Sequence, residues 1–188
     1  MNRIQIKGYK SIKELDLSLR SINILIGANG SGKSNFLSFF DFLKQIYKRN
    51  LREFVALKGV DTFLHNGDKV TLEIATHLYF KGTNAYSFTL KKGDTGLIFT
   101  EEGMWNGKNP YYNNPIDITS FNNESNLRNQ TIPRANFIRK YLNNLAKYHF
   151  HDTGENSPFN KESNIENDKF FFYEKGNNLA AFLYNINK

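Results

Sequence analysis

The residues from Gly27 to Ser34 are those whose types and spacing could do chemistry. They match the pattern G-x-x-x-x-G-K-S/T in full. The glycines allow positive φ angles and a close approach of the backbone to an anion. Successive amides can surround a phosphate, a lysine can reach the terminal phosphates, and a serine hydroxyl can ligate Mg²⁺. The spacing therefore predicts a nucleotide site with Ser34 as the Mg²⁺ ligand, formed by Gly27, Ala28, Asn29, Gly30, Ser31, Gly32, Lys33 and Ser34.

A phosphate-binding loop of this kind needs a strand before it and a helix after it, and the flanking residues predict both. Ile22–Ile26 is a continuous apolar run, typical of a strand buried on both faces. A largely buried helix is predicted from Lys33 to Lys48, followed by a short helix over Leu51–Lys58. The predicted fold class is therefore α/β, with a mixed sheet around the helix that follows the loop.

The rest of the chain predicts an antiparallel β-lobe and further helices. Alternating apolar and polar residues separated by turn sequences indicate most of the strands. The predicted strands are Arg3–Lys7, Glu14–Leu19, Lys69–Phe80, Ala85–Lys91, Gly96–Thr100 and Tyr148–His151, and the further helices are Arg134–Lys147 and Asn178–Ile186. We expect one partial domain with a core over residues 1–60, an antiparallel lobe over 61–105 and a loop-rich, helical segment over 106–188.

Composition excludes several classes of protein. The 188 residues are 39% hydrophobic and 23% charged, which excludes a disordered chain. The chain has no cysteine, so disulfides, thiolate metal sites and cysteine nucleophiles are excluded. It has no apolar run of about 18 residues, and its first residues lack the apolar region of a secretory signal. We therefore expect a cytoplasmic protein without a membrane partner.

The positive charge is concentrated in the first third of the chain. The net charge is +7, and residues 1–60 hold 11 Lys and Arg against 4 Asp and Glu, whereas the remainder is balanced. An anionic partner is therefore expected there. Lys44, Lys48 and Arg52 recur at every fourth position, with Arg49 beside them. If the two helices are continuous, these residues form a basic stripe that could contact DNA; a solvated helix face is the alternative.

The flanks of the loop resemble a known family. The stretches IKGYKSIKELDLSL and INILIGANGSGKSN resemble the N-terminus of ABC-type ATPases of the SMC/RecF branch, of which Asn29 and Asn35 are typical. LREFVALKGV, TFLHNG, YSFTL, YHFHDT and NLAAFLYNI resemble RecF-like AAA-family ATPases of bacterial genomes, several of which belong to DNA-repair and anti-phage defence systems. The resemblance covers nearly the whole chain but only the N-terminal half of a typical member.

The resemblance implies a fold, ligands and partners. The fold would be the first lobe of an ABC-type ATPase head, and the ligands would be ATP and Mg²⁺. In the intact protein, ATP would drive a head-to-head dimer that works with DNA and with a nuclease or other effector. DNA repair or anti-phage defence is the implied role.

The resemblance also adds candidate site residues. Lys10 and Ser11 occupy a turn that lies beside the nucleotide in the resembled branch, and a solvated turn is the alternative. Tyr9 could stack on adenine or pack in the core. His149 or His151 would point at the γ-phosphate from a strand end. A structural pair of histidines and a His-x-His-Asp metal site are the alternatives.

Parts of the family's catalytic machinery do not occur in this sequence. There is no S-G-G signature and no apolar strand that ends in Asp-Glu. Leu97–Glu102 and Phe170–Glu174 imitate the second motif, but both carry Glu where the Mg²⁺-binding Asp belongs, so we interpret them as strand ends that meet solvent. Gln5, Gln45 and Gln130 do not have the strand-end position of the family's γ-phosphate glutamine.

We therefore expect the N-terminal portion of an ATPase, which alone binds ATP and hydrolyses it slowly or not at all. One alternative is a truncated nucleotide-binding remnant without turnover. A P-loop phosphotransferase is the other, although no acceptor site or cluster of lid arginines is visible.

Overall fold

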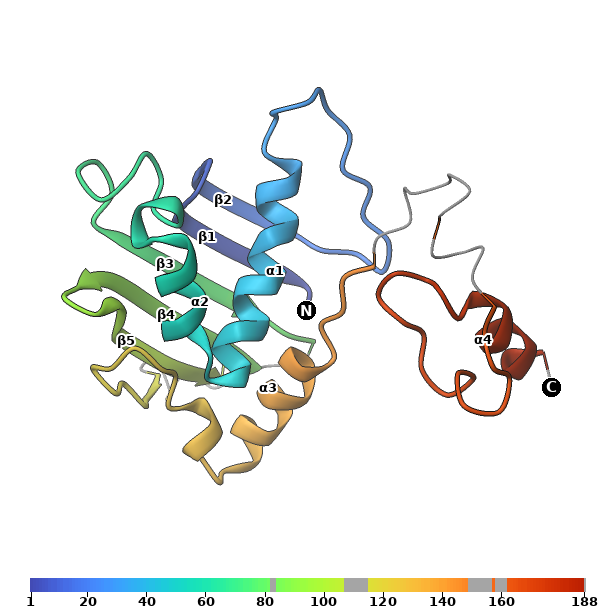
Figure 1. Ribbon diagram of the computed structural model, residues 1–188. Helices are drawn as coiled ribbons and strands as arrows, with labels where there is room; N and C mark the ends of the chain where they lie inside the picture. Colours follow the sequence, from blue (N-terminus) through green and yellow to red (C-terminus); the bar gives the residue numbers. More distant parts are fainter. Residues whose placement is uncertain (82–83, 107–114, 149–156, 158–161, 188) are drawn as a thin grey trace. The chain divides into compact units, whose positions relative to one another are not determined.

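Six antiparallel strands form one sheet in the order β2-β1-β3-β4-β5-β6. The computed structural model describes residues 1–81, 84–106, 115–148, 157 and 162–187. The chain divides into two units, 1–145 and 146–188, and the first contains the whole sheet (Figure 1). The strands are β1 (Arg3–Tyr9), β2 (Ile12–Ser18), β3 (Glu73–Tyr79), β4 (Asn84–Gly93), β5 (Gly96–Asn106) and β6 (Ile116–Asp117).

Strand β1 pairs along both of its edges and joins the early strands to the later ones. Ile6 lies opposite Leu15 of β2 on one side and Thr76 of β3 on the other. The strands that we expected in a core over residues 1–60 therefore belong to the same sheet as the β3–β4–β5 meander. Every pairing in the described sheet is antiparallel.

Three helices cover one face of this sheet (Figure 1). They are α1 (Lys33–Lys48), α2 (Leu51–Lys58) and α3 (Pro133–Asn143), so the first two have the predicted bounds and the third ends earlier than predicted. The helices bury side chains at helical spacing against the inward-facing residues of the strands. The helical part of the core consists of Phe39, Phe42, Leu43, Ile46, Leu51, Val55, Ala135, Ile138 and Leu142.

A buried carboxylate fixes the loop after β6 to the sheet. Glu102 of β5 accepts hydrogen bonds from the hydroxyl of Tyr86 (2.6 Å), from the hydroxyl of Ser125 and from the backbone amide of Asn126 (2.9 Å). Burial raises the pKa of Glu102, whereas these donors oppose that rise by stabilising the charged form. Glu102 therefore has a structural role. The expectation that it lies at a strand end meeting solvent is wrong, because Glu102 is buried and lies inside β5.

The opposite face of the sheet carries polar and aromatic side chains. The His77 imidazole stacks on the Tyr79 ring, with centroids 4.3 Å apart, and the Trp105 ring lies 5.3 Å from His77. Burial, helped by the nearby Arg3 guanidinium, lowers the pKa of His77 from 6.5 to about 4. This face therefore holds a histidine that is neutral at physiological pH.

The prediction of a buried strand at Ile22–Ile26 is wrong for this structure. These residues form no strand, and Ile22, Ile24 and Ile26 are 81%, 79% and 90% exposed. No described strand pairs with them, so their backbone groups have no ladder to join and their side chains have no sheet to face. The predicted mixed sheet is wrong for the same reason, since this segment would have supplied its central strand.

The second unit, residues 146–188, contains the predicted C-terminal helix as α4 (Leu179–Ile186). Asn178, before this helix, is buried and donates to the carbonyl oxygens of Asp168 (2.7 Å) and Phe171 (2.5 Å). Phe170–Glu174 forms no strand, so the interpretation of this stretch as a strand end is wrong. The strand predicted at Tyr148–His151 lies outside the described residues from position 149 onwards.

Candidate functional site

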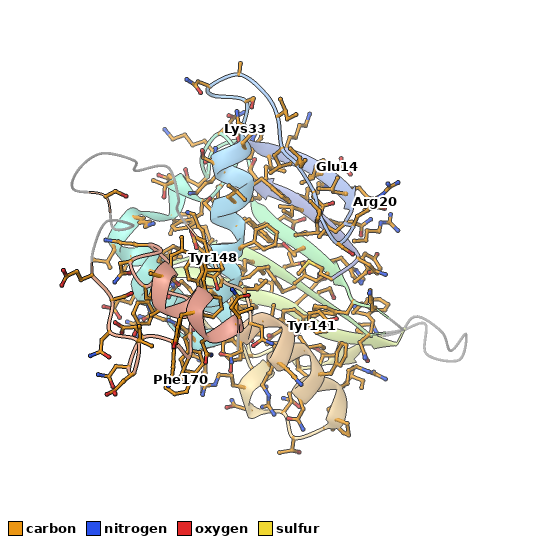
Figure 2. All side chains as sticks on the ribbon, turned by 90° about the vertical axis from the view of Figure 1, so that its right-hand side faces the viewer. Glu14, Arg20, Lys33, Tyr141, Tyr148 and Phe170 are labelled. Carbon is orange, nitrogen blue, oxygen red and sulfur yellow. The ribbon has the colours of Figure 1, made fainter. Side chains whose placement is uncertain are left out.

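The loop from Gly27 to Gly32 leads directly into the first turn of α1, where Lys33 lies (Figure 2). Gly30 and Gly32 have φ angles of 84° and 92°, in the left-handed region that favours glycine. A side chain at Gly27 would place its Cβ 2.8 Å from the Ser31 hydroxyl oxygen. The positive φ angles of Gly30 and Gly32 therefore favour glycine at these two positions, as the motif predicts.

The N-terminus of α1 presents amides that no side chain caps. Gly32 is the N-cap residue and supplies no side-chain hydrogen bond, and the first turn contains no acidic residue. The first amides of a helix have no acceptor within the helix, and the helix dipole places partial positive charge there. This end of α1 is therefore suited to an anion.

The Lys33 ammonium lies across the loop. Its Nζ donates to the carbonyl oxygens of Gly27 and Ala28, both at 2.7 Å, and to the Ser31 hydroxyl at 3.1 Å. A phosphate bound in the loop would offer charged acceptors in place of these neutral carbonyls. The adjacent Ser34 is exposed in the first turn of α1, and a serine hydroxyl is an oxygen ligand suited to Mg²⁺. The residues present therefore fit a polyphosphate with its metal ion.

The turn between β1 and β2 lies against this first turn of α1. The side-chain amide of Asn35 donates to the Ser11 hydroxyl at 2.8 Å, and a Cβ at Gly32 would be 3.1 Å from the same oxygen. The Lys10 ammonium donates to the Ser38 hydroxyl at 3.1 Å. The structure thus brings Lys10, Ser11 and Asn35 to the glycine-rich loop.

Tyr9 packs in the core and is not available to stack on a base. Its ring is 1% exposed and lies 5.0 Å from the Phe39 ring in an edge-to-face arrangement. Its hydroxyl lies 3.1 Å from the Ser38 hydroxyl. Burial raises the pKa of Tyr9. Of the two interpretations of this residue, the packing role holds.

The basic residues at the end of α1 do not form one continuous row. Arg49 has a φ angle of 58° and ends α1, after which the chain turns back into α2 (Figure 1). Arg52 therefore does not extend the row that contains Lys44 and Lys48. Arg49 donates to the Asn129 side chain at 3.3 Å, while Lys48 and Arg52 are exposed.

The remaining residues considered from the sequence are two histidines and the glutamines. His149 and His151 lie outside the described residues, and the part of the chain that is described contains no cluster of three or more metal-ligating side chains. Gln5 is bonded to Asp16 on the open face of the sheet, and Gln45 accepts from Asn50 near the end of α1.

Sequence reasoning missed His65, whose ring nitrogen Nδ1 lies 2.7 Å from the carbonyl oxygen of Lys10. The stretch TFLHNG was noted only as part of a resemblance, and no motif marks its histidine. A single histidine in a polar turn gives no periodic signal, so only the contact with the Lys10 carbonyl identifies it.

Comparison with known proteins supports an ATP-binding ATPase. Residues 1–188 match the family model described as "AAA ATPase domain". A 50-residue stretch is 46% identical to the tungstate uptake system ATP-binding protein TupC of Campylobacter jejuni. That match covers 27% of this chain and 15% of the relative. No helix in the described part of the chain is both long enough and apolar enough to span a bilayer.

Proposed function

Because the chain belongs to the AAA ATPase domain family, we propose that it binds ATP with Mg²⁺ through the loop Gly27–Ser34. The observation that carries this proposal is the glycine-rich loop at the uncapped N-terminus of α1, with the Lys33 ammonium across it. The motif, the left-handed glycines and the free helix end all favour a polyphosphate ligand.

Each residue of the site has a role in this proposal. The amides of the loop and of the first turn of α1 bind phosphate oxygens, and Lys33 transfers its hydrogen bonds from the loop carbonyls to the β- and γ-phosphates. Ser34 ligates Mg²⁺, which neutralises phosphate charge when bound. Asn35 keeps the Lys10–Ser11 turn against the loop through its bond to Ser11. Lys10 adds positive charge at the edge of the site.

We propose that this chain alone lacks some of the groups that ATP hydrolysis requires. A carboxylate that polarises the attacking water is needed, yet the acid that best imitates one, Glu102, is already hydrogen-bonded inside the β4–β5 region. We therefore expect this chain alone to bind ATP and to turn it over slowly.

We further propose that the chain is the ATP-binding portion of a RecF-like ATPase of the bacterial cytoplasm. The resemblance of the GYKS turn and of the residues around the loop supports this assignment. In the intact protein, ATP would close a head-to-head dimer whose hydrolysis then opens it. This proposal includes a role in DNA repair or anti-phage defence and an effector partner such as a nuclease. It also includes contact with DNA through the exposed basic residues near the end of α1.

Replacing Lys33 with alanine tests the proposed site. The change removes the ammonium that would bind the terminal phosphates, so we expect the affinity for Mg²⁺–ATP to fall by about 10- to 150-fold, given that a charged hydrogen bond contributes about 1.5–3 kcal/mol. Isothermal titration calorimetry with a non-hydrolysable ATP analogue measures the change.

Lys48→Ala is the matched control, because Lys48 is an exposed lysine at the other end of the same helix. It should leave the affinity within about twofold. Equal losses in the two variants, or an unchanged affinity in Lys33→Ala, would refute the assignment of the loop.

A further inference from the structure

The segment that follows α2 holds the turn between β1 and β2. The Lys10 amide donates to the Phe63 carbonyl at 2.9 Å, and the His65 amide donates to the Gly8 carbonyl at 3.0 Å. Leu64, between these two residues, forms an antiparallel bridge with Tyr9. The backbone of residues 63–65 therefore holds the end of β1 where the chain turns towards Ser11.

His65 adds a side-chain bond to this backbone contact. Its Nδ1 lies 2.7 Å from the Lys10 carbonyl oxygen, which can only accept, so Nδ1 carries the hydrogen and donates. Its Nε2 is then free to accept, and the Asn66 side-chain amide lies 3.3 Å away. The Thr71 hydroxyl donates to the His65 carbonyl at 2.5 Å. The imidazole is thus oriented from both ring nitrogens and its backbone is held as well.

The residue that His65 contacts has an unusual backbone conformation. Lys10 has a φ angle of 48°, in the left-handed region that residues with side chains seldom adopt. Such a conformation is strained and persists only where surrounding contacts hold it. The bonds to the amide and the carbonyl of Lys10 are contacts of that kind.

The same turn touches the candidate nucleotide site on its other side. The Ser11 hydroxyl accepts from the side-chain amide of Asn35 at 2.8 Å and lies 3.1 Å from where a Cβ of Gly32 would be. A shift of the turn by a few tenths of an ångström would therefore alter the contacts of both residues. These two residues flank Lys33 and Ser34.

We infer that His65 is a positioning residue for this site. His65 fixes the Lys10–Ser11 turn, and this turn supports the glycine-rich loop. The inference rests on the proposed function, because the site is taken to bind a nucleotide. His65 does not contact the loop itself in any described interaction, so its effect passes through Lys10 and Ser11.

The test compares His65→Ala with His65→Asn in the full 188-residue chain. An asparagine amide can replace the Nδ1 donor, whereas alanine cannot. We expect the affinity for Mg²⁺ with a non-hydrolysable ATP analogue to fall about tenfold in His65→Ala and to return to within about threefold of the wild type in His65→Asn. His77→Ala is the matched control, since His77 lies on the open face of the sheet; it should leave the affinity within about twofold.

A second measurement needs no nucleotide. Amide hydrogen exchange of the ligand-free chain should be faster in His65→Ala at Gly8–Ser11 and also at Ser31–Asn35, while β4 stays protected. Faster exchange at the turn but not at the loop would overturn the inference, as would an affinity in His65→Ala within twofold of the wild type.

The two proposals fail in different ways. If the wild type binds no nucleotide, or Lys33→Ala binds as well as the wild type, the proposed function is wrong, and the exchange experiment alone decides whether His65 supports the loop. If Lys33→Ala loses binding but His65→Ala does not, only the role of His65 is wrong.

Discussion

Strand β1 and the segment Ile22–Ile26 are both short apolar runs near the start of the chain, yet their environments are opposite. In β1, Ile4 and Ile6 are fully or almost fully buried, whereas Ile22, Ile24 and Ile26 are mostly exposed. β1 has a strand on each edge and helices over its apolar face. The other segment has no strand partner among the described residues. Hydrophobicity therefore buries a strand only where neighbouring strands also satisfy its backbone.

The residues with candidate chemistry follow directly on the less packed of these two regions. Residues 21–31 are all exposed, and the glycine-rich loop takes its position from α1 behind it and from the Lys10–Ser11 turn beside it. The sheet and its helices provide stability, and the loop provides the proposed binding groups. Three changes test this division, in order of decreasing effect on stability.

The largest loss is expected from Phe42→Ala in the middle of α1. The Phe42 ring is fully buried and lies 5.3 Å from the Tyr9 ring and 5.5 Å from the Phe63 ring. Removing it leaves a cavity between α1 and the sheet, which should lower the free energy of unfolding by about 3–5 kcal/mol. Urea denaturation followed by circular dichroism measures this loss. A loss below about 1 kcal/mol would show that α1 is not part of the stabilising core.

A smaller effect, which depends on pH, is expected from His77→Gln. Because burial lowers the pKa of His77 to about 4, the unfolded chain takes up a proton before the folded chain does as the pH falls. The contribution of His77 to stability is therefore present above pH 6.5 and is lost as the pH falls towards 4. After allowance for solvent screening of a half-buried ring, we expect His77 to account for a loss of about 1–2 kcal/mol in the free energy of unfolding of the wild type over this fall in pH.

The measurement is urea denaturation of wild type and variant at pH 7 and at pH 4.5. The wild type should lose more stability between these two values than His77→Gln, which lacks the group that titrates. Equal losses of stability in the two proteins would mean that groups other than His77 account for the whole pH dependence of the free energy of unfolding.

The smallest effect is expected from Ile24→Ala, the counterpart of the change in α1. Ile24 is 79% exposed, so its removal leaves no cavity and the free energy of unfolding should change by less than about 0.5 kcal/mol. The same denaturation experiment measures it. A loss of 2 kcal/mol or more would contradict the comparison, because it would mean that Ile24 is packed in solution.

The sequence predicts the local parts of the fold well. Alternation identifies β1, β3 and β4, and the bounds of α1 and α2 follow from apolar spacing and from the glycine-rich loop. The joining of the early strands to the meander was not predicted, because the pairing of Ile6 with Thr76 leaves no local signal. Strand β6 has only two residues, too few to show a period.

The candidate site, like the fold, has local parts that the sequence predicts and long-range contacts that it does not. The loop residues follow from one motif, and their glycine conformations agree with it. The buried strand at Ile22–Ile26 was wrongly predicted, because an apolar run carries no information about which strands are available to pair with it. The support of the loop by His65 depends on a hydrogen bond between residues far apart in the chain, and no spacing rule predicts such a bond.

The position of β1 between β2 and β3 has a consequence for the order of folding. Strands β3, β4 and β5 are neighbours in the chain and can form as hairpins. The pairing of β1 with β3 instead requires the closure of a long loop, which includes the glycine-rich loop and α1. Docking of β1 is then a late event, and it also brings the Lys10–Ser11 turn to its place. The candidate nucleotide loop would be among the last parts of the molecule to assemble, so under the proposed function a nascent chain would not bind ATP before its sheet is complete.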